Sequence, residues 1–151
     1  MLNGRDPGEL GLYGFRQRVP GSYGLRVASS ADLALPMVWD TLAAAGRRCS
    51  VLFVPPSFPP RAFAGESVSC FLTPDATELH THPPELGAEL AAQFGPYEPD
   101  VESYRTDDLP ALRETVYRQS AQRFDIAEYL LRTRQPEFLA DHAEAPSQRL
   151  L

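Results

Sequence analysis

The chain has 151 residues, of which 43% are hydrophobic and 23% charged, a globular composition long enough for one ordinary domain. The formal net charge of −6 at pH 7 argues against a nucleic-acid partner, because an acidic surface repels phosphate backbones. No apolar stretch approaches the length of a membrane span, and no basic region leads into a hydrophobic one at the N-terminus. We therefore expect no membrane partner and a cytoplasmic location.

Residues 1–30 carry six glycines together with Pro7 and Pro20. Neither a two-residue nor a 3.6-residue apolar period is visible there, so this region is predicted to be mostly loop. The opening MLNGRDPGELGLYGF ends in the aromatic residues Tyr13 and Phe15. Such a stretch is typical of an internal loop that folds against a larger body.

A helix followed by a buried strand is predicted over 35–55. LPMVWDTLAAAGRR has Pro36 for the first turn, Gly46 as a C-terminal cap and a helical apolar stripe of Met37, Val38, Leu42 and Ala45. CSVLFVP, over 49–55, is a continuous apolar run, which indicates a strand buried on both faces, as in a parallel sheet. A helix, a glycine turn and such a strand form half of a βαβ unit and predict the α/β class.

The proline-rich segment PPSFPPRAFAG, over 55–65, is predicted to be a stiff, extended connection without regular secondary structure. SVSCFLTPD, over 67–75, is either a short strand or an irregular edge. PPELGAELAAQFG, over 83–95, predicts a helix with Leu86, Leu90 and Phe94 on one face and Gly95 at its end.

The longest helix is predicted over 109–134, with Asp107 or Asp108 as its N-cap. Its core-facing residues are predicted to be Leu112, Val116, Ser120, Phe124, Ala127 and Leu131. The tail QPEFLADHAEAPSQRLL begins like a strand and then loses its pattern.

Few residues indicate chemistry by their pattern. His80 and His82 would point to one side of a strand and could share a metal, although solvated loop histidines are the favoured interpretation. Asp141 and His142 are an adjacent pair of ligand types, again interpreted as exposed residues. Cys49 and Cys70 are interpreted as buried free thiols, with a disulfide as the minor alternative. The sequence has no phosphate loop, dinucleotide fingerprint, nucleophile elbow or zinc-type cysteine cluster.

Five stretches together resemble the type I phosphodiesterase/nucleotide pyrophosphatase family of the alkaline phosphatase superfamily. In chain order they are NGRDPGELGLYGF, SSADLALPMVWDTLAAAGRRCSVLFVPPSFPPRAFAG, VSCFLTPD, THPPELGAEL and YEPDVESYRTDD. The resemblance covers roughly residues 3–134, and the order of the motifs is more specific than any one of them. The chain departs from the family at Leu10-Gly11, where members commonly have His-Gly.

The resemblance implies a fold in which helices surround an incomplete, mostly parallel sheet, as part of an alkaline-phosphatase-like sandwich. It also implies that the intact family acts on small phosphate esters with two divalent metals, often zinc. In that chemistry a threonine or serine attacks the phosphorus while the metals stabilise the developing charge.

By the same resemblance, the chain begins after the nucleophile and the first metal-binding aspartate of the family. At the other end, DHAEAPSQRLL stands where an Asp-x-x-x-His metal motif is expected, so no metal role passes to Asp141 or His142. Residues 1–135 are thus a partial family domain and 136–151 an off-pattern tail. No catalytic, cofactor-binding or metal-binding residue is assigned, and no metal is expected for this chain.

The expected function is that of a fragment of a metal-dependent phosphoric-ester hydrolase that is inactive alone. One alternative is a small non-enzymatic α/β binding protein. Another is a module that docks with a complementing chain carrying the missing strands.

Overall fold

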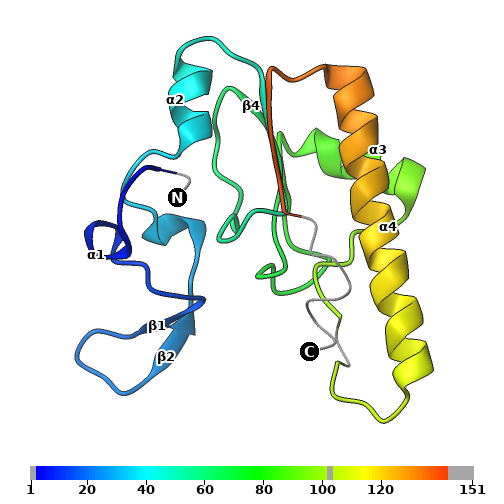
Figure 1. The fold of residues 1–151 in the computed structure, drawn as a ribbon, viewed down its shortest axis with the longest axis horizontal. Helices are drawn as coiled ribbons and strands as arrows, with labels where there is room; N and C mark the ends of the chain where they lie inside the picture. The colour runs from blue at the N-terminus through cyan, green and yellow to red at the C-terminus, as the bar shows by residue number, and fades with distance from the viewer. Residues whose placement is uncertain (1–2, 102–103, 143–151) are drawn as a thin grey trace.

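The computed structural model describes residues 3–101 and 104–142, which form a mixed α/β fold with a small mixed sheet (Figure 1). Its strands are β1 (Arg16–Arg18), β2 (Leu25–Val27), β3 (Cys49–Leu52), β4 (Gly65–Val68), β5 (Thr81–His82) and β6 (Phe138–Asp141). Its helices are α1 (Pro7–Leu10), the 3₁₀ turn η1 (Ser30–Asp32), α2 (Val38–Ala44), α3 (Glu85–Phe94) and α4 (Leu109–Arg134). Within the described residues, no helix combines the length and the apolar character needed to cross a membrane.

The main sheet has the strand order β5-β4-β3-β6. β3 is parallel to both β4 and β6, and only β5 runs antiparallel, against β4. All four residues of β3 are buried, which confirms the strand buried on both faces that the apolar run predicted. Figure 1 shows α2 on one side of this sheet and α3 and α4 on the other, so helices cover both faces.

β4 begins at Gly65, two residues before the segment in which the sequence suggested a strand. Gly65 lies opposite Cys49 in the parallel register. A Cβ at this position would come within 2.4 Å of the Cys49 carbonyl oxygen and 2.3 Å of the Phe63 ring. The pairing of β3 with β4 therefore depends on a glycine that follows the proline-rich crossing directly. The segment between β3 and β4 contains no helix or strand, as predicted.

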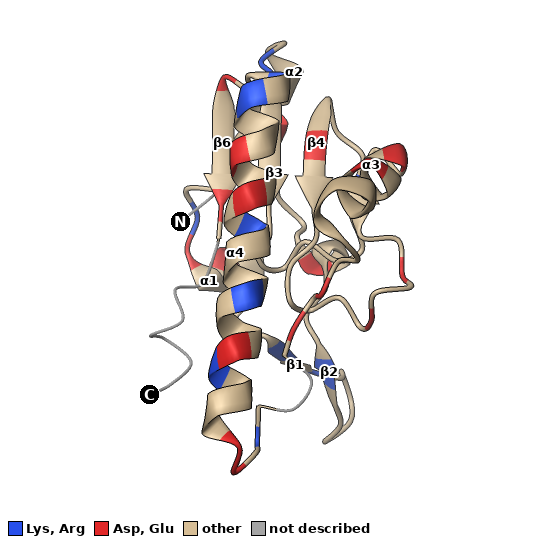
Figure 2. Ribbon diagram, turned by 90° about the vertical axis from the view of Figure 1, so that its right-hand side faces the viewer, with Lys and Arg blue, Asp and Glu red and all other residues tan. Residues whose placement is uncertain are grey.

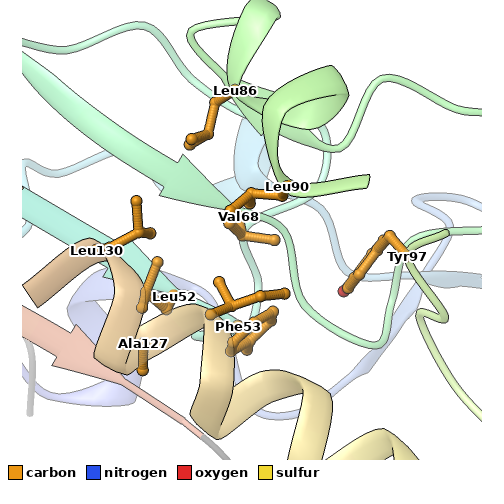
Figure 3. Close-up of a cluster of buried hydrophobic side chains, with 9 residues drawn as sticks. Leu52, Phe53, Val68, Leu86, Leu90, Tyr97, Ala127 and Leu130 are labelled. Carbon is orange, nitrogen blue, oxygen red and sulfur yellow. The ribbon is translucent and has the colours of Figure 1, made fainter. Parts of the chain in front are cut away.

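The core lies between the sheet and the two helices α3 and α4 (Figure 3). The sheet contributes Leu52 and Val68, whereas α3 contributes Leu86 and Leu90 as predicted. The remaining members are Phe53, Tyr97, Ile126, Ala127 and Leu130. Two layers of secondary structure thus share one apolar interior.

α4 has the predicted bounds, and Asp108 is its N-cap, because its Oδ1 accepts a hydrogen bond of 3.1 Å from the Ala111 amide. The predicted core face of α4 was wrong in part. Phe124 and Leu131 are 53% and 45% exposed, and the buried residues are Val116, Gln119, Arg123, Ile126, Ala127 and Leu130. The helix is rotated because Gln119 and Arg123 face the loop before it, where they donate hydrogen bonds to the carbonyls of Glu98 and Pro99.

α2 and α3 are shorter than predicted. α2 begins at Val38 rather than near Pro36, since Asp40 accepts a 2.8 Å hydrogen bond from the Met37 amide and so fixes the start. Gly46 adopts a φ of +78°, which suits the predicted end of this helix. α3 starts at Glu85 and ends before Gly95.

Residues 3–30 are mostly loop, as predicted, but a short helix and a hairpin interrupt them. Asp6 caps the short helix α1 by accepting a 3.0 Å hydrogen bond from Glu9. β1 and β2 form an antiparallel hairpin of three residues each, and both strands are largely exposed. Because neither strand has a buried face, no apolar alternation marks them in the sequence. Of the two aromatic residues expected to fold against a larger body, Phe15 meets Phe71 edge-on at 5.2 Å between ring centroids but is 51% exposed, and Tyr13 is 77% exposed.

The hairpin is tied to η1 by Asp32. Its carboxylate accepts hydrogen bonds of 2.7 and 2.5 Å from the Arg26 guanidinium and one of 2.8 Å from the Ser29 amide. The Arg26 bonds are the largest cause of an Asp32 pKa lowered to about 2. A carboxyl group with a lowered folded-state pKa stabilises the fold above its unfolded pKa of 3.8, and this stabilisation is lost as the pH falls toward 2.

We therefore expect Asp32→Asn to lower the free energy of unfolding at pH 7 by about 1 kcal/mol, a figure reduced for the solvent screening of Arg26. The loss should shrink between pH 4 and pH 2, which urea titrations across this range would measure. Asp107→Asn is the control, because Asp107 is exposed. A loss that stays constant with pH would show that Asp32 acts by packing rather than by charge.

Candidate functional site

The carboxyl ends of the three parallel strands lie at the same edge of the sheet. Leu52 of β3 is in register with Val68 of β4 and with Asp141 of β6. In open α/β sheets, ligands bind outside this edge, because loops leave it in different directions and form a crevice. The segments that follow β3 and β4, together with Asp141 and His142 at the end of β6, therefore form the candidate site, which we call the carboxyl edge.

Phe53 turns the chain sharply as it leaves β3. Its φ of +59° lies in the left-handed region, which costs a residue with a side chain about 1–3 kcal/mol. Its amide donates a 2.8 Å hydrogen bond to the Val68 carbonyl, and its ring is 1% exposed. A non-glycine residue in this conformation persists only where the surroundings fix it, and here both its backbone and its ring are held.

Arg123 reaches the Phe53 ring from α4, although only 4% of it is exposed. The guanidinium carbon lies 5.3 Å from the ring centroid, a cation–π distance. One terminal nitrogen donates a 2.8 Å hydrogen bond to the Pro99 carbonyl, while the buried Nε has no hydrogen-bond partner. A buried cation is costly unless it is compensated, so this incompletely bonded arginine is the most unusual group at the edge.

Tyr97 is a second neighbour of the Phe53 ring. Its ring stacks on Phe53 at 6.2 Å and on His80 at 4.6 Å between centroids. Its hydroxyl donates a 2.5 Å hydrogen bond to the Ser69 carbonyl, directly after β4. Burial raises the pKa of Tyr97 well above its ordinary value, so the hydroxyl stays a donor. The 97–101 loop is thereby fixed to the exits of β3 and β4.

Asp141 ends β6 at this edge. Partial loss of hydration raises the pKa of its carboxyl group, whereas the charges of His142 and Arg123 act in the opposite direction. The carboxyl edge thus combines the Asp141 carboxylate with the buried Arg123 guanidinium. The two groups interact electrostatically at a distance, without a hydrogen bond between them.

A cavity of about 580 Å³ opens beside the carboxyl edge. Its walls come from residues 73–76, residues 97–101 and the N-terminal half of α4. Asp75, Glu98, Asp100 and Asp108 give it an acidic lining, and Arg118 bonds Glu98 at 3.1 Å. This volume would accommodate a small molecule.

The two predicted histidine candidates have separate partners. His82 lies in β5, with Nε2 3.1 Å from the Phe63 carbonyl oxygen. His80 precedes the strand, its Nδ1 is 2.9 Å from the Glu78 carbonyl oxygen, and its ring is stacked on Tyr97. Among residues 3–101 and 104–142, no group of three or more His, Cys, Asp or Glu side chains is placed to hold a metal ion.

The cysteines are buried and free, as the favoured interpretation predicted. Sequence reasoning missed Phe53, Tyr97 and Arg123. Arg123 carried a signal, because it is seven residues from Val116 and so shares its helical face. A charged residue on an apolar face is a candidate for a buried functional group.

Comparisons with protein-family models, with curated proteins and with solved structures found no match.

The effect of the Arg123 charge on the pKa of Asp141 can be tested directly. Arg123→Met should raise the pKa of the Asp141 carboxyl further, because the cation that favours its charged form is removed. Carboxyl ¹³C NMR titration would measure this pKa. Arg118→Met, which removes a cation from the same helix, should leave it unchanged. An unchanged Asp141 pKa in Arg123→Met would contradict the electrostatic coupling.

Proposed function

We propose that this chain is a segment of a metal-dependent phosphoric-ester hydrolase of the phosphodiesterase/nucleotide pyrophosphatase type, with an alkaline-phosphatase-like sandwich as its parent fold, and that it is inactive alone. The carboxyl edge is the observation that carries this proposal. Three parallel strands end there in register, and a buried arginine acts on the aspartate that ends one of them. Phosphoryl transfer requires fixed positive charge near the reacting oxygens, and α/β enzymes position such groups at this edge.

The motifs behind the family resemblance support the proposal through their positions. The helix-and-strand motif forms α2 and β3, and the proline crossing leaves β3 at the carboxyl edge. VSCFLTPD covers the end of β4 and its exit, while THPPELGAEL covers β5 and much of α3. The substrate class of the parent would be small phosphate mono- or diesters, nucleotide pyrophosphates among them.

The described residues do not fit the two metals of that family. A catalytic zinc takes about three protein ligands. The carboxyl edge presents Asp141 and His142 as neighbouring ligand types, and no cluster of three ligating side chains is formed within the described ranges. Arg123 also places a positive charge near Asp141, which disfavours a cation. No step of the hydrolysis is assigned to a metal held by these residues.

The second candidate is a non-enzymatic α/β binding or complementation module. Two observations favour it: the cavity of about 580 Å³ and the exposed apolar side chains along α4. Exposed apolar surface of this kind marks a binding site for another chain.

Inactivity of the chain is tested with bis(p-nitrophenyl) phosphate. The purified full chain with added Zn²⁺ should release nitrophenolate no faster than the same protein with a chelator, because the described residues form no cluster of metal ligands that could activate a nucleophile. Zinc alone in buffer serves as the blank. Zinc-dependent turnover above both controls would overturn the proposal of inactivity.

The identity of the parent is tested at the locus. Sequencing from well upstream of the Met1 codon to well past the stop should reveal the nucleophile segment and an Asp-x-x-x-His motif, in the same frame or a shifted one. Confirmed flanks that encode neither would reject the hydrolase segment and leave the binding module.

A further inference from the structure

A row of large apolar side chains lies exposed along α4. Tyr117, Phe124 and Leu131 are 55%, 53% and 45% exposed. They are seven residues apart, so at 100° per residue they fall within a narrow arc of the helix. We call this row the α4 stripe. Apolar side chains aligned over two turns or more are typical of a helix that packs against another helix.

The α4 stripe lies on the flank of the helix that faces away from α3. α3 is contacted by Tyr129, whose ring is 5.6 Å from that of Phe94, and by Gln122, which donates a hydrogen bond to the Phe94 carbonyl. These two residues are on the opposite side of the helix from Phe124. Thr115 and Arg118, which line the cavity, also face that other side.

The residues around the stripe are self-complementary in one antiparallel register. If Phe124 packs on the partner's Tyr117, then Leu131 meets the partner's Pro110, and Arg113 meets the partner's Glu128. The small residues Ser120 and Ala121 then lie at the two-fold axis, where the helices come closest.

Charge selects this orientation over the parallel one. Arg113 and Glu128 lie near opposite ends of the stripe. Antiparallel packing brings these opposite charges together across the interface, where the partner's Arg113 would join the 3.2 Å ion pair between Glu128 and Arg132. Parallel packing would place Arg113 against the partner's Arg113, and Glu128 against the partner's Glu128, which is repulsive. Figure 2 shows that α4 carries both basic and acidic residues along its length.

We infer that the α4 stripe is the interface of a homodimer in which two copies of α4 pack antiparallel, with Phe124 near the centre. The occupant of the stripe is therefore a second copy of this chain. This inference goes beyond the proposed function and does not rest on it, since it concerns the surface of α4 alone.

Sedimentation equilibrium of the full chain tests the inference. The unmodified protein should sediment with twice the 16.7 kDa mass of one chain at micromolar concentrations. Phe124→Glu should raise the dissociation constant at least about thirtyfold, because it buries a charge at the centre of the interface. Leu79→Glu is the matched control, since Leu79 is 54% exposed but lies outside α4. Circular dichroism would confirm that both variants keep their helix content.

Cysteine crosslinking tests the orientation, and the native Cys49 and Cys70 do not interfere because they are buried. Ser120→Cys should form an intermolecular disulfide under mild oxidation, because it lies next to the two-fold axis. Arg113→Cys should not, since the antiparallel register separates the two equivalent positions by about 22 Å along the helices.

A chain that stays monomeric, or a Phe124→Glu variant that dimerises like the unmodified protein, would overturn the inference. Crosslinking of Arg113→Cys in place of Ser120→Cys would overturn the antiparallel arrangement. Neither result would bear on hydrolysis or on the flanking sequence of the locus, so this inference and the proposed function fail separately.

Discussion

The fold depends on β3, which is hydrogen-bonded along both edges and buried on both faces. Its four residues are at most 2% exposed. β4 pairs with one edge after the proline crossing, and β6 pairs with the other only after the whole of α3 and α4. Segments more than eighty residues apart are therefore held in one register by a strand of four residues. Loop closure over this length has an entropic cost that the apolar burial around β3 must offset.

Residues at the carboxyl edge are ordered by the same strand. Phe53 follows β3 directly with a left-handed turn, and its ring is in contact with both Tyr97 and the Arg123 guanidinium. The cation is partly compensated by the ring and by the Pro99 carbonyl, while its Nε has no hydrogen-bond partner. The backbone strain of Phe53 and the desolvation of Arg123 thus occur together at the carboxyl edge, where the parallel strands end. Such local costs are more often found at functional sites than elsewhere in a fold.

The sequence predicted those elements whose signals are local. α4 was predicted with its bounds because Asp108 and its helical period act within a few residues, and β3 because a strand buried on both faces has no polar alternation. The buried face of α4 was predicted only in part. Apolar residues occupy two adjacent arcs of this helix, and the choice between them is made by the 97–101 loop, whose carbonyls bind Gln119 and Arg123. That loop is distant in sequence, so periodicity alone could not identify the arc. The β1–β2 hairpin escaped prediction because a strand without a buried face has no apolar period.

The two arcs of α4 face different surroundings, because successive residues of a helix point in directions about 100° apart. One arc covers the sheet and carries Arg123 to the carboxyl edge. The neighbouring arc carries the α4 stripe, whose large apolar side chains stay exposed and are not part of the core. A second copy of α4 would cover the stripe while Thr115 and Arg118, on the far flank, keep the cavity open. The proposed dimer interface and the cavity therefore lie on different flanks of this helix.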